Sequence, residues 1–135
     1  MASTWRMGAA PDGFELVAVH DGEVIGHLLA ARGRLGAREV VGVAPLAVLP
    51  AHHGQGVGSA LMTELLLRAE AAALPLLVLL GHPAYYARFG FEAAGPLSIT
   101  YGGESNPHFL VRRLPTYDPV CRGDFVYCWE AERRT

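Results

Sequence analysis

Hydrophobic and polar residues alternate near the start of the chain in the way that is typical of strands. The segment Phe14 to His20 alternates apolar and polar side chains, which favours a strand with one covered face. Asp21-Gly22 follows, a dipeptide that accepts the positive φ angles of a tight hairpin turn. Glu23 to Ala31 then predicts a second, antiparallel strand. Arg32 to Gly36 is expected to be a loop because of its glycines and charges.

The middle of the chain predicts a strand, a helix and a buried strand. Glu39 to Leu49 is an apolar run that contains Pro45, and proline cannot donate a hydrogen bond to a sheet ladder, so we expect an unpaired or bulged position there. Ser59 to Ala73 has its apolar residues at helical spacing. Leu76 to Leu80 is wholly apolar, as expected of a buried parallel strand that follows a crossover helix.

The pattern weakens toward the C-terminus. Ala84 to Phe89 is predicted to be a short helix that Gly90 caps, and Phe91 begins another strand. His108 to Leu114 and Asp124 to Trp129 are strand candidates, separated by loops rich in glycine, serine and proline. The order of elements predicts an α+β fold with a mixed sheet.

Composition bounds the class of protein. With 135 residues, 51% hydrophobic and 18% charged, the chain (1-135) is expected to form one domain. The net charge of -2 leaves no electrostatic footprint for nucleic acid, and no apolar run reaches the ~20 residues of a membrane span. Met1 to Ala10 lacks a signal-peptide pattern, so we expect a cytoplasmic protein. Cys121 and Cys128 are then expected to be free, buried thiols, with a disulfide as the alternative.

The most informative segment for chemistry is the glycine turn from Gly54 to Gly58, which lies between the Pro45-containing strand and the long helix. Glycines alternate there, and without Cβ atoms the backbone can curl so that successive N–H groups point inward. The helix that follows adds unpaired N–H donors and the positive end of its dipole. The turn is therefore shaped to hold an anion such as a pyrophosphate.

Other phosphate-binding loops fit this segment less well. A Walker A loop needs a lysine after its last glycine, and Ser59 stands there instead. A dinucleotide fingerprint needs a third glycine at Ser59, and an acidic residue at the end of the next strand, which Leu76 to Gly81 lacks. The segment could also be a tight turn with no ligand. That interpretation does not explain why the chain carries alternating glycines, which cost conformational entropy on folding.

Two segments carry a resemblance to a known family. The sequence His53-Gly-Gln-Gly-Val-Gly58 resembles the acyl-CoA-binding motif of the GNAT superfamily of N-acetyltransferases, and Tyr85-Tyr-Ala-Arg-Phe-Gly-Phe91 resembles its second signature. One helix and one strand separate the two segments, as in the family. The segment that begins at Gly81 resembles the corresponding segment of a subgroup of predicted bacterial N-acetyltransferases. The resemblance spans roughly Phe14 to Leu114. It implies a central mixed sheet whose two parallel strands splay apart, and acetyl-CoA as cosubstrate.

The resemblance also implies which residues bind the cosubstrate. Backbone groups at the end of the third strand would hold the pantetheine arm and place the thioester, and the amides of the turn would wrap the pyrophosphate. The implied acetyl-CoA-binding residues are Leu46, Ala47, Val48, His53, Gly54, Gln55, Gly56, Val57, Gly58 and Ser59. No metal is implied.

For the chemistry, the resemblance places Tyr86 at the family's general-acid position, where a phenol protonates the leaving thiolate. A backbone N–H near Val48 is expected to stabilise the oxyanion. The general base stays open: His82, His52 and His27 are candidates because histidine titrates near neutral pH, and an ordered water is another. Tyr85 is expected to pack rather than react, because adjacent helical residues face different ways.

The chain departs from the family pattern at the acyl-CoA motif, at the front of the chain, and after the second parallel strand, where the Asn of many family members is absent. His53 replaces the usual Gln or Arg at the head of the motif. Only thirteen residues precede Phe14, so we expect the first strand and the two helices that roof the acceptor site to be truncated or absent. Another subunit or protein would then supply the cover, or the site is open to large substrates; a homodimer is among the arrangements left open. The sequence thus predicts an N-acetyltransferase for a primary amine of a small molecule or protein, with a non-catalytic acyl-CoA-binding module as the alternative.

Overall fold

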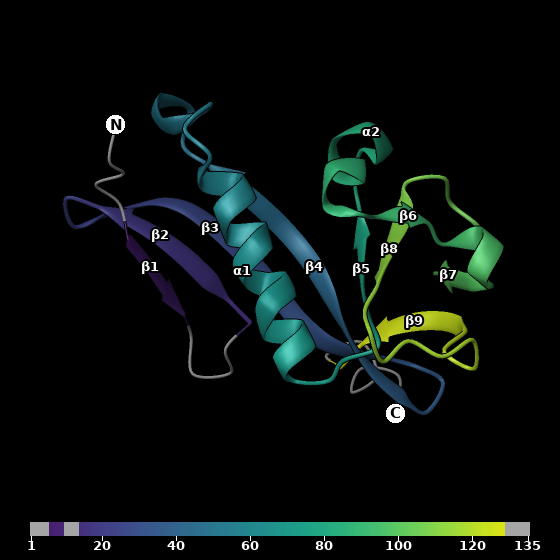
Figure 1. Cartoon of the computed structure of the whole chain (residues 1–135). Coiled ribbons are helices and arrows are strands. Elements are labelled where there is room, and N and C mark those ends of the chain that lie inside the picture. The colour runs from purple at the N-terminus through teal and green to yellow at the C-terminus, as the bar shows by residue number, and fades with distance from the viewer. Residues whose placement is uncertain (1–5, 10–13, 129–135) are drawn as a thin grey trace.

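The computed structural model describes residues 6–9 and 14–128, and its elements are shown in Figure 1. In chain order these are β1 (Arg6–Ala9), β2 (Leu16–His20), β3 (Glu23–Leu35), β4 (Arg38–Val48), η1 (Pro50–His52), α1 (Val57–Ala71), β5 (Leu76–Leu80), α2 (Pro83–Tyr86), η2 (Ala87–Phe89), β6 (Glu92–Ala93), η3 (Gly95–Leu97), β7 (Ile99–Tyr101), β8 (Phe109–Arg113) and β9 (Gly123–Tyr127), where η marks a turn of 3₁₀ helix.

The strands of the described residues form one mixed sheet in the order β1-β2-β3-β4-β5-β8-β6. Strands β1 to β4 are antiparallel neighbours, and β4 and β5 are parallel, as the apolar run after the helix predicts. Asp21 and Gly22 both have positive φ angles (50° and 76°), which confirms the tight turn between β2 and β3. The short first strand β1 was not expected from the sequence pattern.

Strand β3 continues through Arg32–Leu35, so the predicted loop at Arg32 to Gly36 is wrong except at its last glycine. This segment is paired on both edges, because Arg32 to Leu35 pair with the adjacent strand β4 and Gly33 to Leu35 also pair with β9, far along the chain. Gly33 serves close packing there: a Cβ atom at this position would lie 2.6 Å from the Phe125 ring. Strand pairing on both edges, with the adjacent β4 and the distant β9, therefore outweighs the local pattern of glycine and charge.

Helix α1 covers one face of the sheet (Figure 1). Its buried residues recur at helical spacing and form the helix side of the first core cluster: Val57, Leu61, Met62, Leu65 and Ala69. Each fully buried Leu or Met stabilises the fold by about 1.5–3 kcal/mol relative to an exposed side chain. The predicted helix is thus confirmed, although it begins two residues earlier and ends two residues earlier than expected.

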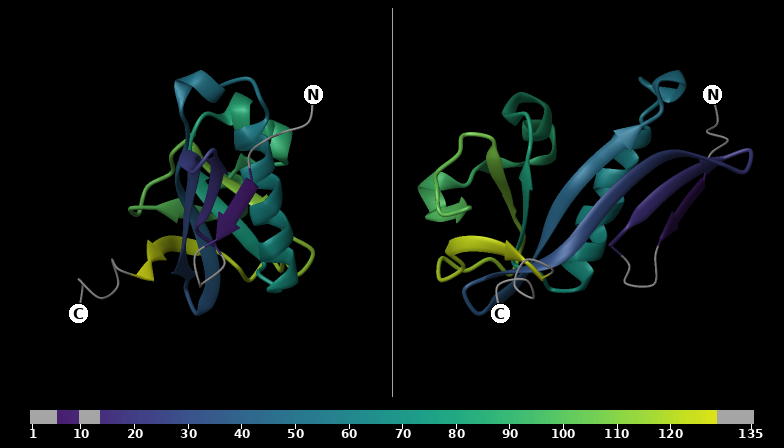
Figure 2. Two further views of the ribbon diagram at one scale, coloured as in Figure 1. Left: turned by 90° about the vertical axis from the view of Figure 1, so that its left-hand side faces the viewer. Right: turned by 180° about the vertical axis from the view of Figure 1, so that it is seen from behind.

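A second core cluster lies on the opposite face of the sheet, beneath β7 and β9 (Figure 2). Strand β9 pairs with the C-terminal half of β3 and with β7, so β7 and β9 extend the sheet over this face. Phe125 is the largest side chain fully buried there. Cys121 is a buried free thiol in the same cluster, but Cys128 is exposed, so the expectation that both thiols are buried is wrong for Cys128.

The two parallel strands separate at their C-terminal ends, which is the feature that positions the site. Pairing between β4 and β5 runs only from Val41 to Val43. Beyond it, β4 carries a bulge, because Leu28 pairs with Leu46 but Ala30 pairs with Val43. The bulge includes Pro45, as its missing N–H predicts. Figure 1 shows β4 and β5 diverging from this point.

The remaining elements follow the sequence expectations with shifted ends. The short helix is present as α2 and η2, and Gly90 caps it with a φ of 81°. Strand β8 lies within the predicted segment His108 to Leu114, whereas β9 begins at Gly123, one residue before the predicted segment Asp124 to Trp129. Strand β7 was not predicted, and Trp129 lies outside the described residues. Within residues 6–9 and 14–128, no helix is both long and apolar enough to cross a membrane.

Candidate functional site

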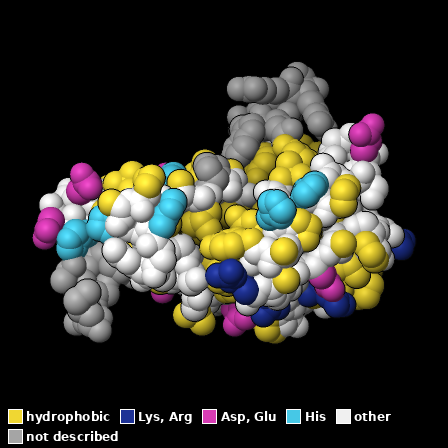
Figure 3. All heavy atoms as spheres, turned by 90° about the horizontal axis from the view of Figure 1, so that it is seen from above, with side chains coloured by type: hydrophobic (Ala, Val, Ile, Leu, Met, Phe, Trp, Pro, Cys, Tyr) yellow, Lys and Arg dark blue, Asp and Glu magenta, His cyan; other side chains and the backbone are white. Residues whose placement is uncertain are grey.

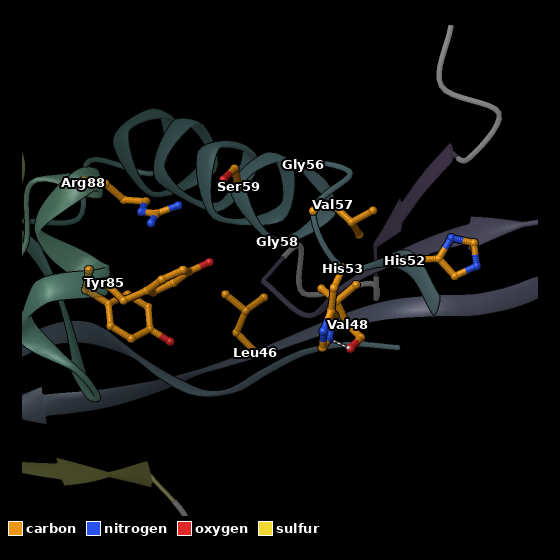
Figure 4. A pocket seen from close by; sticks show the side chains of 12 residues that line it. Leu46, Val48, His52, His53, Gly56, Val57, Gly58, Ser59, Tyr85 and Arg88 are labelled. Carbon is orange, nitrogen blue, oxygen red and sulfur yellow. Dashed lines mark hydrogen bonds between the residues drawn. The ribbon is translucent and has the colours of Figure 1, made fainter. Parts of the chain in front are cut away.

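A pocket of about 510 Å³ opens where β4 and β5 separate, between the glycine turn and α2 (Figure 4). Its volume lies in the range of small-molecule sites. The lining combines the end of β4, the turn, the start of α1 and the short helix: Leu46, Val48, His52, His53, Gly54, Gly56, Val57, Gly58, Ser59, Tyr85, Tyr86 and Arg88. Eight of the ten predicted binding residues line this pocket, whereas Ala47 and Gln55 do not.

The glycine turn has the backbone conformation that its sequence predicts. Gly54 and Gly56 have φ angles of 78° and 81°, in the left-handed region that only glycine adopts readily. A Cβ atom at either position would meet nothing within 4 Å, so conformation rather than space requires glycine there. Gly56 is also the residue that precedes the first turn of α1.

The N-terminus of α1 presents main-chain donors to the pocket. The first intrahelical bond joins the Ala60 N–H to the Gly56 carbonyl at 3.0 Å, so the amides of Val57, Gly58 and Ser59 have no acceptor within the helix. No side chain caps this end, and its first turn carries no acidic residue. The helix dipole therefore adds positive potential to three unpaired donors, an arrangement suited to a bound phosphate.

The end of β4 offers further backbone groups. The Leu49 N–H donates to the Ile25 carbonyl (2.8 Å), and alternation along the strand then turns the peptide groups of Ala47 toward β3 and those of Leu46 and Val48 away from it. Because β5 has already separated, Leu46 and Val48 face the opening. His53 Nε2 lies 2.7 Å from the Val48 carbonyl oxygen, which fixes the ring beside the turn (Figure 4).

Two adjacent tyrosines enter the pocket from α2. The rings of Tyr85 and Tyr86 meet edge to face, with centroids 4.9 Å apart. Tyr85 reaches across to α1, where its hydroxyl oxygen would lie 3.5 Å from a Cβ atom at Gly58 (Figure 4). The two side chains face different neighbours, as expected of adjacent helical residues, because Tyr86 packs against Gly81 and the first core cluster, but both line the pocket.

Tyr86 is half-buried and packs against the first core cluster. Burial raises the pKa of Tyr86 above its ordinary value, and the neighbouring Tyr85 raises this pKa further. The ring lies against Gly81 so closely that a Cβ atom at that position would overlap it. Gly81, directly after β5, thus makes room for the tyrosine.

Arg88 places a guanidinium group in the lining of this pocket. Its Cζ atom lies 4.5 Å from the centroid of the Tyr85 ring, a cation–π contact that orients the side chain along the pocket wall. Figure 4 shows Arg88 near the N-terminus of α1. Arg88 was not predicted from the sequence and Tyr85 was predicted only to pack, although Tyr85 and Arg88 are three residues apart on one short helical segment, a spacing at which side chains interact.

Of the three histidines predicted as candidates for the general base, His52 lines the pocket, whereas His82 and His27 do not. His82 is exposed outside the pocket lining, and its ring lies 6.0 Å from that of His108. His52 lines the pocket, but its ring points away from the other labelled side chains in Figure 4 and contacts Gln55 at 3.1 Å. His27 lies elsewhere, paired with Glu15 at 2.8 Å. Figure 3 shows histidines on both sides of the hydrophobic middle of this end of the molecule.

Across the described residues, no three His, Cys, Asp or Glu side chains gather as metal ligands would. The site is instead a cleft of backbone donors, one arginine and two tyrosines. This composition suits a large anionic ligand that carries phosphate groups.

Sequence comparison places this cleft in a known group of proteins. A family model described as an acetyltransferase (GNAT) domain matches residues 11–93. The chain is 32% identical over 96 residues to the uncharacterized N-acetyltransferase YjhQ of Escherichia coli K12, covering 68% of this chain and 53% of that protein. It is 40% identical over 89 residues to YhbS of the same strain, covering 62% and 53%. The chain thus spans about half the length of these curated relatives.

Solved structures agree with the sequence comparison. The crystal structure of YhbS from Escherichia coli, in complex with CoA, superposes with a TM-score of 0.76 at 32% identity and covers 92% of this chain and 73% of its own. A GNAT family acetyltransferase from Brucella melitensis, in complex with acetyl-CoA, gives 0.66 at 34% identity, with 84% and 64% covered. The splayed mixed sheet with its glycine turn is therefore the GNAT fold, and the chain belongs to the GNAT acetyltransferase family.

Proposed function

We propose that the chain, residues 1–135, acts as one acetyl-CoA-binding domain that transfers the acetyl group to a primary amine. The observation that carries this proposal is the open N-terminus of α1, whose amides from Val57 to Ser59 face the pocket beside two left-handed glycines. Family membership supports it, as do the CoA and acetyl-CoA complexes of the proteins from Escherichia coli and Brucella melitensis.

In this proposal the pyrophosphate of acetyl-CoA binds the main-chain amides of the glycine turn and of α1. Arg88 supplies the positive side chain of the lining, and a guanidinium suits phosphate geometry. His53 takes the place of the family's usual Gln or Arg, with its ring held at the Val48 carbonyl oxygen. The main-chain amide of Gln55, between Gly54 and Gly56, belongs to the same turn, although Gln55 does not line the pocket.

The pantetheine arm then runs along the end of β4. Leu46 and Val48 have peptide groups that face the opening, so an extended arm bonds to them as a strand would. Ala47 lies between them in the chain, but its peptide groups face β3, so it does not bond to the arm. The acetyl thioester consequently comes to lie between β4 and the tyrosines of α2.

The chemistry follows from groups around that point. The lone pair of a neutral amine attacks the thioester carbonyl carbon, a C–N bond forms, and the C–S bond breaks. The Val48 N–H stabilises the oxyanion, and Tyr86 donates its hydroxyl proton to the leaving sulfur. The proton of the attacking amine passes to a base. We propose His82 for that role, because it lies directly after Gly81 at the end of β5.

The test combines binding with turnover. Calorimetric titration with CoA measures occupancy of the pocket, and release of the CoA thiol from acetyl-CoA across a panel of primary amines measures transfer. The proposal predicts binding together with thiol release that depends on the amine. Binding without release on any amine favours the alternative, a non-catalytic acyl-CoA-binding module, and absence of binding contradicts both.

A further inference from the structure

A second pocket lies on the other face of the sheet, at the same separation of β4 and β5. It encloses about 380 Å³ and is lined by Val43, Ala44, Leu80, Tyr101, Phe109 and Tyr127. Ala44 lies in the bulge that precedes Leu46, and Leu80 precedes Gly81, against which Tyr86 packs. The two pockets therefore lie on opposite faces of the sheet, beside the same separation of β4 and β5.

The lining of this second pocket is aromatic and apolar. Tyr101 stacks on Phe109 with ring centroids 5.4 Å apart, and Tyr127 meets Tyr101 edge to face at 6.1 Å. Tyr127 lies flat on β4, because a Cβ atom at Gly42 would be 2.6 Å from its Cε1 atom. The lining residues include no charged side chain.

The size of the pocket suits an aromatic group. An apolar cavity of about 150 Å³ holds a benzene ring, so about 380 Å³ admits a ring together with a short arm. A second ammonium group or a carboxylate on the ligand would be desolvated without an opposite charge among the lining residues, which is costly. A hydrophobic ring gains both apolar contact and edge-to-face contacts with the tyrosines.

We propose that this pocket selects the acceptor: a primary amine that carries an aromatic or branched apolar group on a short arm and no second charge. The inference rests on the proposed function, since the acetyl group arrives from the first pocket. The ring binds against Tyr101 and Tyr127, and the arm passes between β4 and β5 to present the amine to the thioester.

The first arm of the test compares amines that share a short arm. We expect kcat/KM for 2-phenylethylamine to exceed that for ethanolamine by roughly 10- to 200-fold, the range that apolar contacts supply in enzyme pockets. Spermidine and phenylalanine, which carry an additional charge, should be poorer substrates than 2-phenylethylamine. Preference for ethanolamine, spermidine or phenylalanine would overturn the proposed acceptor class while leaving the acetyltransferase function intact.

The second arm uses a matched pair of variants. Leu80 is 50% exposed in the pocket wall, and Leu67 is 58% exposed on α1, away from the pocket, so L80D and L67D carry the same change at similar exposure. We expect L80D to lower kcat/KM for 2-phenylethylamine by about tenfold or more, with an unchanged Kd for CoA. L67D should leave both values unchanged. Equal values for L80D and the unmodified protein would contradict the proposal.

A third arm does not depend on turnover. Calorimetric titration of the CoA-saturated protein with 2-phenylethylamine should give binding that L80D weakens and L67D retains. A protein that binds CoA but not this amine contradicts the acceptor proposal alone. A protein that binds no CoA contradicts the proposed function itself, so the two failures are distinguishable.

Discussion

At the residue scale, the proposed chemistry depends most on Tyr86. Its ring packs on Gly81 and against the first core cluster, which holds the phenol at the pocket wall. Burial and the neighbouring Tyr85 both raise the pKa of Tyr86. A raised pKa keeps the proton on the phenol through the neutral range, which is the state that a general acid requires.

Replacing Tyr86 by phenylalanine removes the proton donor but keeps the ring. We expect Tyr86→Phe to lower kcat by roughly 10²- to 10⁴-fold, the usual contribution of a general acid, with little change in the Kd for CoA. Steady-state kinetics with calorimetry separates the two quantities. An unchanged kcat would show that Tyr86 is a packing residue.

The pH dependence of kcat follows from the same group. Because the pKa of Tyr86 is raised above the ordinary tyrosine value of about 10, the phenol ionises, and the acid is lost, only as pH rises through that higher value. We expect the alkaline fall of kcat to lie above pH of about 10 and to be absent in the residual activity of Tyr86→Phe. A fall near neutral pH that persists in Tyr86→Phe would assign that limb to another group.

At the element scale, the N-terminus of α1 and the turn before it form the proposed phosphate site. Gly56 has a φ of 81° with open space around it, and Gly36, in the turn between β3 and β4, has a φ of 58° and equally open space. A Cβ atom in the left-handed region costs roughly 1–2 kcal/mol at either position. The two glycines therefore form a matched pair for mutation.

We expect Gly56→Ala to weaken CoA binding by about tenfold, because relief of the strain moves the amides of the turn. Gly36→Ala should carry a similar cost in stability without any effect on CoA affinity. Calorimetry and urea unfolding of both variants make the comparison. Equal CoA affinity in the two variants would argue against the glycine turn as the phosphate site.

The pairing of β9 with β3 gives a stability prediction. A Cβ atom at Gly33 would lie 2.6 Å from both the Phe125 ring and the Val126 carbonyl oxygen, whereas one at Gly8 would lie 3.4 Å from Val17. We expect Gly33→Ala to lower the free energy of unfolding by roughly 1–3 kcal/mol and Gly8→Ala to change it by less than about 0.5 kcal/mol. Urea unfolding measures the free energy of unfolding of both variants. Equal losses in the two variants would show that β9 moves to accommodate the added methyl group.

The elements predicted from the sequence are those with a local cause. The turn at Asp21-Gly22, helix α1 and the buried strand β5 follow from φ preference, helical spacing and a continuous apolar run. The missed parts include β7, which pairs with the distant β9, and the second half of β3, which pairs both with the adjacent β4 and with β9. Long-range pairing leaves little trace in a short, glycine-containing segment.

The candidate site divides in the same way. The glycine turn and Tyr86 were predicted because their motifs are contiguous in the chain. Tyr85 and Arg88 were missed because their place in the pocket depends on how the single turn of α2 is set against α1. The aromatic pocket was missed too, since β4, β5 and the strands after α2 bring its residues together only in the folded sheet.

At the scale of the whole molecule, two pockets lie on opposite faces of one sheet, beside the separation of β4 and β5. In the proposed function both substrates bind at once, and the amine attacks the thioester directly. We expect intersecting initial-velocity lines and no acetylated protein after incubation with acetyl-CoA alone. Parallel lines, with an acetyl group retained on the protein by mass spectrometry, would instead indicate a covalent intermediate.

The proposed function is tested most directly by locating the residues at which CoA binds. In a titration of the isotope-labelled protein with CoA, followed by backbone amide NMR, we predict the largest shifts at Gly56 to Ser59 and at Val48, because these amides face the first pocket. Shifts confined to the strands around Phe125, or an unchanged spectrum at saturating CoA, would contradict it.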